Sequence, residues 1–173
     1  MSLATTTNYL TPTGREEPWR FTPLNRIGGL HDPSVELHDR ISLEPSDIPA
    51  GVTITVEDAL AFPPLSANED QVVTRIREGV SKVLVVTIAT NAEVALPIFL
   101  VRTILDMNPE ISRVQVNAGV NSHATLVISN SGDGIFAEEI ELNLAAGSNV
   151  RFSTPSRVGI KGGSRRETSC HHR

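Results

Sequence analysis

The feature that most constrains the fold is a run of short alternating segments between residues 114 and 152. Apolar side chains occupy every second position in "HATLVIS" and "EEIELNLAAG", and small turns rich in Gly, Asn and Ser separate such segments. A period of two is typical of a β-strand with one buried face, because successive side chains of a strand point to opposite sides. The chain is therefore predicted to be α+β or mainly β.

Two architectures satisfy this alternation. Gly119 and Gly147 each follow a strand-like segment and a small residue, which is a weak internal repeat. Such a repeat is typical of a solenoid, whose coils use small turns and stack apolar residues inward. A β-sandwich would produce nearly the same pattern. Periodicity alone leaves both architectures open.

The segments before residue 114 are also regular. "VTITVEDAL" is typical of a strand, and "KVLVVTI" and "ALPIFLV" have the continuous apolarity of strands that are buried on both faces. A short helical turn is expected after Pro23, closed by Gly28 or Gly29, because glycine tolerates the left-handed backbone at a helix end.

Residues 66–80 predict the clearest helix. Ser66 and Glu69 stand at capping-box spacing, where each can satisfy a free amide of the first turn. Gly79 is expected to weaken or end the helix. The apolar stripe expected to face the core is Val72, Val73, Ile76 and Val80.

Composition excludes some function classes. Aromatic residues are only 4% of the 173 residues, so a core must be built from aliphatic side chains, and the net charge of −5 argues against a general nucleic-acid or membrane-surface binder. The longest apolar stretch is interrupted by Pro97 and polar residues, which favours buried strands over a membrane span. The first residues lack the features of a secretory signal, so a cytoplasmic location is expected.

No catalytic constellation is visible, and we expect neither an enzyme nor a resident cofactor. The sequence lacks a phosphate-binding glycine loop and a G-x-S-x-G turn. Glu138, Glu139 and Glu141 could be metal ligands, and alternation places Glu139 and Glu141 on one strand face. We interpret them instead as a solvated strand face.

Metal ligands are also not expected elsewhere. Cys170 to His172 offer soft and borderline ligands, but adjacent residues cannot surround a metal without partners from other segments. His31, His38 and His123 are too isolated in the sequence to be assigned as those partners. An enzyme with a cupin-like or sandwich fold is therefore disfavoured.

"EEPWRFTPL" (Glu16 to Leu24) resembles the N-terminal signature of SufD-like subunits in the SufB/SufD family. The resemblance extends over about residues 15–152. Trp19 is interpreted as an anchor for the N-terminal segment. The motif residues, to which we assign no chemical role, are Glu17, Trp19, Arg20, Thr22, Pro23 and Leu24.

The resemblance implies a fold and a function. The fold is a small N-terminal helical segment followed by the first coils of a right-handed parallel β-helix. The function is that of a scaffold subunit in iron–sulfur cluster assembly, partnered by a SufB-like subunit and a SufC-like ATPase, with the cluster handled transiently by the whole complex. The cluster-handling residues of the family lie in later segments and are not assigned to this chain.

The family pattern is lost near residue 153. Residues 154–173 contain five basic residues and one acid, with no hydrophobic period. We expect a flexible segment 1–14, a mixed helical region 15–82, the start of a β-helix core 83–153 and a disordered basic tail 154–173. This organisation predicts a truncated subunit that lacks the SufC docking region and has impaired function. The alternative is a stand-alone, β-rich, non-enzymatic ligand-binding domain.

Overall fold

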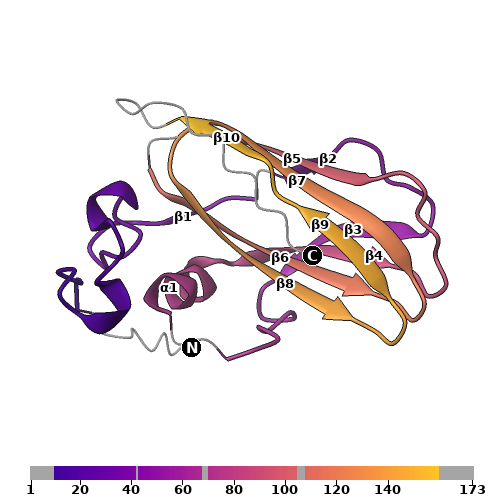
Figure 1. Cartoon of the computed structure of the whole chain (residues 1–173), viewed down its shortest axis with the longest axis horizontal. Helices are drawn as coiled ribbons and strands as arrows, with labels where there is room; N and C mark the ends of the chain where they lie inside the picture. Colours follow the sequence, from indigo (N-terminus) through magenta and orange to yellow (C-terminus); the bar gives the residue numbers. More distant parts are fainter. Residues whose placement is uncertain (1–9, 42, 68–69, 105–107, 160–173) are drawn as a thin grey trace.

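The computed structural model describes residues 10–41, 43–67, 70–104 and 108–159. In these ranges the chain is mostly β-structure with one α-helix, and the strands form two sheets that face each other (Figure 1). The elements are the 3-10 turns η1 (Glu17–Trp19) and η2 (Leu24–Arg26), the strands β1 (His38–Asp39), β2 (Leu43–Pro45) and β3 (Val52–Asp58), the helix α1 (Gln71–Gly79), and the strands β4 (Lys82–Ile88), β5 (Ile98–Ile104), β6 (Glu110–Ala118), β7 (His123–Asp133), β8 (Phe136–Leu144), β9 (Asn149–Ser153) and β10 (Ser156–Gly159).

From β4 to β9, successive strands alternate between the two sheets, and β10 stays in the same sheet as β9. Sheet A contains β4, β6 and β8, together with β1 and β3, and sheet B contains β5, β7, β9 and β10, together with β2. The pairs that join β4 to β6 to β8, and β5 to β7 to β9 and β10, are all parallel. Among the described strands, antiparallel pairing occurs between β3 and β4 and between β2 and β5. Each passage of the chain from sheet A to sheet B and back therefore adds one layer, as in a solenoid. Strands β4 to β9 form no hairpins, because consecutive strands lie in different sheets.

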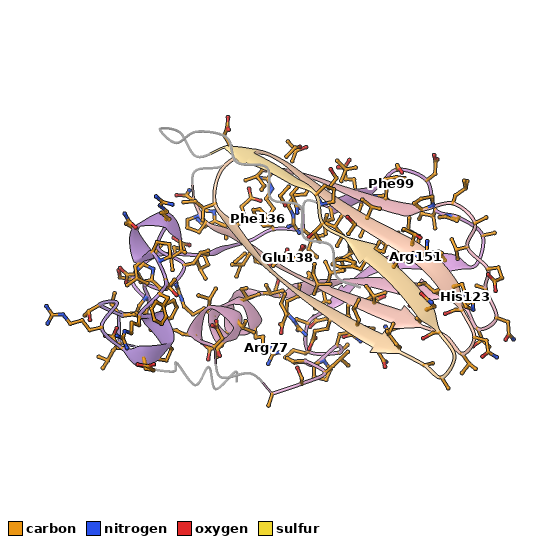
Figure 2. All side chains as sticks on the ribbon, viewed as in Figure 1. Arg77, Phe99, His123, Phe136, Glu138 and Arg151 are labelled. Atoms are coloured by element: carbon orange, nitrogen blue, oxygen red, sulfur yellow. The ribbon has the colours of Figure 1, made fainter. Side chains whose placement is uncertain are left out.

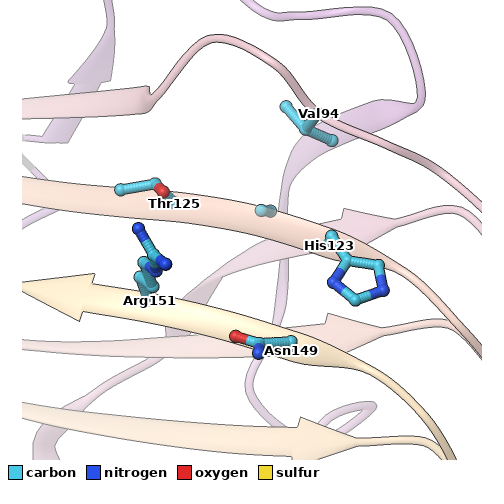
Figure 3. A pocket seen from close by; sticks show the side chains of 6 residues that line it. Val94, His123, Thr125, Asn149 and Arg151 are labelled. Atoms are coloured by element: carbon cyan, nitrogen blue, oxygen red, sulfur yellow. The ribbon is translucent and has the colours of Figure 1, made fainter. Parts of the chain in front are cut away.

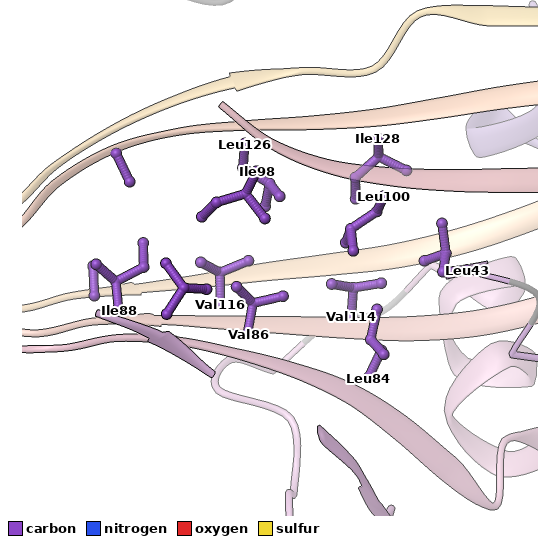
Figure 4. Packing of buried hydrophobic residues seen from close by; sticks show 13 residues of the cluster. Leu43, Leu84, Val86, Ile88, Ile98, Leu100, Val114, Val116, Leu126 and Ile128 are labelled. Atoms are coloured by element: carbon purple, nitrogen blue, oxygen red, sulfur yellow. The ribbon is translucent and has the colours of Figure 1, made fainter. Parts of the chain in front are cut away.

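Parallel pairing places apolar residues of successive layers beside one another. In sheet A, Leu84 pairs with Val114, and Val114 pairs with Ile140. The corresponding ladder in sheet B consists of Ile98, Leu126 and Phe152. The two sets of side chains meet between the sheets in one aliphatic core (Figure 4). The alternation seen in the sequence is thus the inner face of both sheets.

The turns that connect the sheets stack as well. Asn91 and Asn121 occupy equivalent turn positions with φ of 58° and 52°, a conformation that Asn tolerates better than most residues. A Cβ on Gly119 would lie 2.6 Å from the backbone nitrogen of Thr90 in the preceding turn. Gly147 has a φ of 72°, which a residue with a side chain adopts only at a cost. The two glycines therefore recur because successive turns approach each other closely.

Burial on both faces was predicted correctly for β4 and wrongly for β5. Four consecutive residues of β4, from Val83 to Val86, are buried. In β5, Phe99 and Val101 are 41% and 43% exposed. The difference arises because α1 and the segment 59–66 lie over the outer face of sheet A, whereas the described residues place no comparable layer on the outer face of β5.

The predicted helix is present, but its predicted start is wrong. α1 begins at Gln71, and its N-cap is Asp70, whose carboxylate accepts hydrogen bonds from the amides of Val72 and Val73. Ser66 is not the cap, because the helix begins well after it. Gly79 ends the helix, as expected, and Ile76 and Val80 are buried against Ile111. No helix in the described ranges is long and apolar enough to cross a membrane.

Paired structure continues past residue 153. β9 and β10 both pair with β7, at successive positions along it. The expected boundary between the β core and a disordered tail therefore falls between two strands of the same layer. Residues 160–173 lie outside the described ranges, as do residues 1–9 of the expected flexible start.

The aliphatic core generates a stability prediction. Leu126 is fully buried, so Leu126→Ala removes core contacts and leaves a cavity. We expect the free energy of unfolding to fall by about 2–5 kcal/mol. Leu60→Ala is the matched control, because Leu60 is 92% exposed and its truncation should change stability by less than about 0.5 kcal/mol. Urea unfolding followed by circular dichroism measures both, and equal effects would contradict this description of the core.

Candidate functional site

The motif residues lie in and around the turns η1 and η2, at the end of the molecule beside α1 (Figure 1). Trp19 is partly buried, and its ring centroid lies 6.2 Å from that of His31 in a tilted arrangement. The guanidinium of Arg20 lies over the ring of Phe21. Glu17, Arg20 and Pro23 are exposed, whereas Trp19, Thr22 and Leu24 are partly buried. The charged residues of the motif are thus exposed to solvent, whereas Trp19 is partly buried beneath the surface.

Helix α1 forms polar contacts with the backbone of residues 29–35, which follow the motif. Arg75 is largely buried and donates hydrogen bonds to the carbonyls of Gly29, Leu30 and Val35. Gln71 donates to the carbonyl of His31. Burial lowers the pKa of Arg75, and the three carbonyl acceptors compensate for the lost hydration of its charge. The chain directly after the motif is therefore joined to the helix, and Trp19 lies against His31 of that chain.

Glu138, Glu139 and Glu141 are ion-paired and not solvated, so the expectation of a solvated strand face is wrong. Glu139 and Glu141 point outward from β8, but their side chains are only 9% and 8% exposed. Arg113 of β6 bonds both carboxylates, at 3.1 Å and 2.9 Å. Arg77 of α1 forms a bidentate pair with Glu139 and lies 3.6 Å from Glu141. Covering by α1 and the segment 59–66 explains why these acids are not solvated.

Glu138 points the other way, into the space between the sheets. Its carboxylate bonds Arg102 of β5 and accepts a hydrogen bond from the hydroxyl of Ser112. Arg102 is 2% exposed and also lies over the ring of Phe136. Figure 2 marks Glu138 and Phe136 on β8 and Arg77 on α1. One strand, β8, thus contributes to a buried charged cluster on each of its faces.

These carboxylates are already satisfied by arginines, so the geometry does not favour metal binding. The hydrogen bond with Glu139 raises the pKa of Arg77, which keeps the pair charged. The described residues contain no group of three or more His, Cys, Asp and Glu side chains that could hold a metal ion. Cys170 and His172 lie outside the described ranges. The clusters can fix strands and a helix in place, which is a structural role.

The three histidines named in the sequence do not come together. His31 lies against Trp19, His38 is in β1, and His123 begins β7. The Nε2 atom of His123 lies 3.8 Å from a carboxylate oxygen of Glu93. Each histidine therefore has its own surroundings, in agreement with their isolation in the sequence.

Sequence reasoning missed the arginine partners of the three glutamates. Arg113 and Glu139 are separated by 26 residues, and so are Ser112 and Glu138. Asn117 and Asn143, which also face each other across β6 and β8, have the same separation. A constant spacing between complementary residues was the available signal, but it can be used only when the length of one coil is known.

The last layer leaves an edge that no described strand pairs. β8 is the outer strand of sheet A, and β9 with β10 is the outer layer of sheet B. Inward residues of this layer are less buried than their neighbours, and Leu142 and Leu144 are 41% and 48% exposed. Unpaired strand edges with apolar side chains beside them are surfaces on which another chain segment can pair. We call this layer the open coil end, and it is the candidate interaction site.

Comparison with known proteins identifies similar chains. The chain is 29% identical over 140 residues to an iron–sulfur cluster assembly SufBD family protein of Mycobacterium leprae, an alignment that covers 78% of this chain. It is 29% identical over 134 residues to SufBD family proteins of Mycobacterium bovis and Mycobacterium tuberculosis. The matched part spans only 35% and 33% of the length of these relatives. No family profile matches the chain, and no solved structure matches it.

The outer charged cluster leads to a prediction about stability. Arg113→Met leaves Glu141 and Glu139 buried with fewer partners, and we expect the free energy of unfolding to fall by about 3–5 kcal/mol. Lys82→Met is the control, because Lys82 and Asp58 form a pair at 3.8 Å in which both side chains are more than half exposed. That change should cost less than about 1 kcal/mol. Chemical denaturation measures both variants. Similar losses in the free energy of unfolding would show that the cluster contributes no more to stability than an exposed ion pair.

A second prediction concerns pH and the start of the motif. Hydrogen bonds from its own backbone amide and from the amide of Thr13, with further bonds from the Thr13 hydroxyl and the Gly14 amide, lower the pKa of Glu16 from 4.5 to about 2. The carboxylate of Glu16 therefore becomes protonated at a higher pH in the unfolded chain than in the folded turn. The stabilisation is fully present above pH 4.5 and is lost as the pH falls toward 2. Carboxyl NMR should give a midpoint near 2. A midpoint at the ordinary value, or unchanged Thr13 and Gly14 amide signals in Glu16→Gln, would contradict this.

Proposed function

We propose that this chain is a scaffold segment of a SufBD-type system for iron–sulfur cluster assembly. The observation that supports this most directly is the similarity to curated SufBD family proteins over about three quarters of the chain. The Trp19 motif lies inside the region of resemblance noted from the sequence alone, and Trp19 lies beside His31, whose carbonyl accepts a hydrogen bond from Gln71 of α1. The chain matches about a third of the length of these relatives, so its proposed role is that of a segment of such a protein.

We further propose that the layers of sheets A and B are the opening coils of a right-handed parallel β-helix. Alternation of successive strands between two sheets and parallel pairing within each sheet support this architecture. The coils are similar in length, because equivalent residues of successive coils are separated by similar numbers of positions. The separation is 30 for Asn91 and Asn121, 28 for Arg102 and Asn130, and 26 for Asn117 and Asn143. A repeating coil of this kind can be extended by further strands.

The proposed molecular role is contact between subunits. The chain is a SufD-like subunit whose open coil end pairs with a SufB-like subunit, because that layer offers unpaired strand edges and the exposed Leu142 and Leu144. The SufC-like ATPase associates through the SufB-like subunit. Clusters are handled by the assembled complex in the cytoplasm, and this chain itself is neither an enzyme nor the holder of a resident cofactor.

Co-expression tests this role. A tagged form of the full 173-residue chain is expressed with a SufB-like and a SufC-like subunit, purified and analysed by size-exclusion chromatography. We expect the SufB-like subunit to co-elute with the chain, and the SufC-like ATPase to appear only when the SufB-like subunit is present.

A pair of leucine substitutions identifies the surface. Leu142→Asp places a charge at the open coil end and should weaken co-elution at least tenfold. Leu60→Asp makes the same chemical change at a position that is 92% exposed and belongs to no strand of that layer, and it should leave co-elution unchanged. Circular dichroism checks that both variants are folded. Absence of any complex, or equal loss in both variants, would contradict the proposed role.

A further inference from the structure

We infer that the outer face of sheet B contains a binding site for a phosphate-type oxyanion. The structure forms a hollow of about 190 Å³ over β7 and β9 (Figure 3). This volume is several times the roughly 30 Å³ that one water molecule occupies in the liquid, so a phosphate group fits with part of the molecule that bears it. We call it the sheet B hollow, and it is lined by Val94, His123, Ala124, Thr125, Asn149 and Arg151.

Strand pairing brings the polar side chains of the hollow together. His123 is the direct partner of Asn149, and Thr125 is the direct partner of Arg151, across the parallel pair β7 and β9. All four are on the outer face, because Ala124 between them points into the core. Adjacent strands are about 4.8 Å apart, and alternate residues of a strand about 6.6 Å apart. Four side chains that can donate hydrogen bonds therefore lie together on one strand pair and line one hollow.

The charge of the hollow selects for an anion. Arg151 is exposed and forms no ion pair with any described residue, whereas Arg102 and Arg113, the other strand arginines with described side chains, are both bonded to glutamates. Figure 3 shows the end of the Arg151 side chain beside Thr125, with Asn149 and His123 further along the same two strands. The carboxylate of Glu93 lies 3.8 Å from His123 and is the negative group that faces this site. Among the described residues Arg151 thus has no ion-pair partner, and it lies beside the hydrogen-bonding side chains of Thr125, Asn149 and His123.

The arrangement of donors fits a tetrahedral oxyanion better than a carboxylate. An arginine fork can bond two oxygens of either ligand. A carboxylate has only those two oxygens, so the donors of Thr125, Asn149 and His123 would remain unused. A phosphate group has further oxygens, which can accept hydrogen bonds from these donors. The shared chemistry is that of free phosphate and of a phosphomonoester such as a nucleotide.

The experiment is an NMR titration of the isotopically labelled full chain with sodium phosphate, and in parallel with adenosine monophosphate, against sodium chloride at matched ionic strength. We expect saturable shifts of amide signals in β7 and β9 with phosphate and not with chloride. An affinity for adenosine monophosphate at least tenfold higher would assign the site to phosphomonoesters, and similar affinities would assign it to the free anion.

Three variants test the residues. Arg151→Gln should weaken phosphate binding about tenfold, the scale of one charge-assisted pair. Arg26→Gln removes the same charge from an exposed arginine in η2 and should leave the affinity unchanged. Glu93→Gln removes the facing carboxylate and should strengthen binding. Shifts that do not saturate, or equal effects of the two arginine substitutions, would overturn the inference. The outcome is independent of co-elution with other subunits, so the two proposals can fail separately.

Discussion

Parallel pairing between layers is the interaction on which the rest of this structure depends. Parallel neighbours such as β4, β6 and β8 need a crossover connection. Here the chain makes it by crossing to the other sheet, where it forms β5, β7 and β9. The crossing closes the space between the sheets, and the inward side chains fill it with aliphatic ladders. Since each layer adds residues to the same ladders, the hydrophobic effect stabilises the stack as a unit. The stacked turns at Gly119 and Gly147 follow from the same pairing.

The buried charges make the register of β8 specific. Glu138 faces inward to Arg102, while Glu139 and Glu141 face outward to Arg113 and Arg77. A shift of one residue would exchange the two faces and leave both clusters without their partners. Unpaired buried charges are costly, so the correct register is favoured strongly even though an aliphatic ladder alone would tolerate a two-residue slip. The same strand borders the open coil end, and the clusters therefore hold the proposed interaction edge in one position.

The sequence predicted the elements well and their neighbours poorly. The strands at "VTITVEDAL" and "KVLVVTI", the helix that ends at Gly79 and the turn before Gly28 are all confirmed, because each depends on local periodicity or on one backbone conformation. The predicted cap at Ser66 and the two-sided burial of β5 were wrong. A cap depends on where the first helical turn forms, and burial depends on which segment covers a face. The glutamates of β8 were misinterpreted for the same reason, since a solvated and a covered strand face have the same sequence pattern.

By itself, the sequence determined that the chain would form aliphatic, period-two strands with glycine-containing turns, because side-chain alternation and backbone freedom are local properties. It also determined where the motif around Trp19 lies along the chain. Only the tertiary structure decided that the strands pair in parallel across layers and that three acids are buried beside arginines. It also decided that Arg151 lies beside His123, Thr125 and Asn149 and forms no ion pair with a described residue. These facts depend on contacts between residues that are far apart in the chain. Which of these residues meet depends on the number of residues in each layer and on which segment covers a sheet face. A local sequence pattern contains neither piece of information.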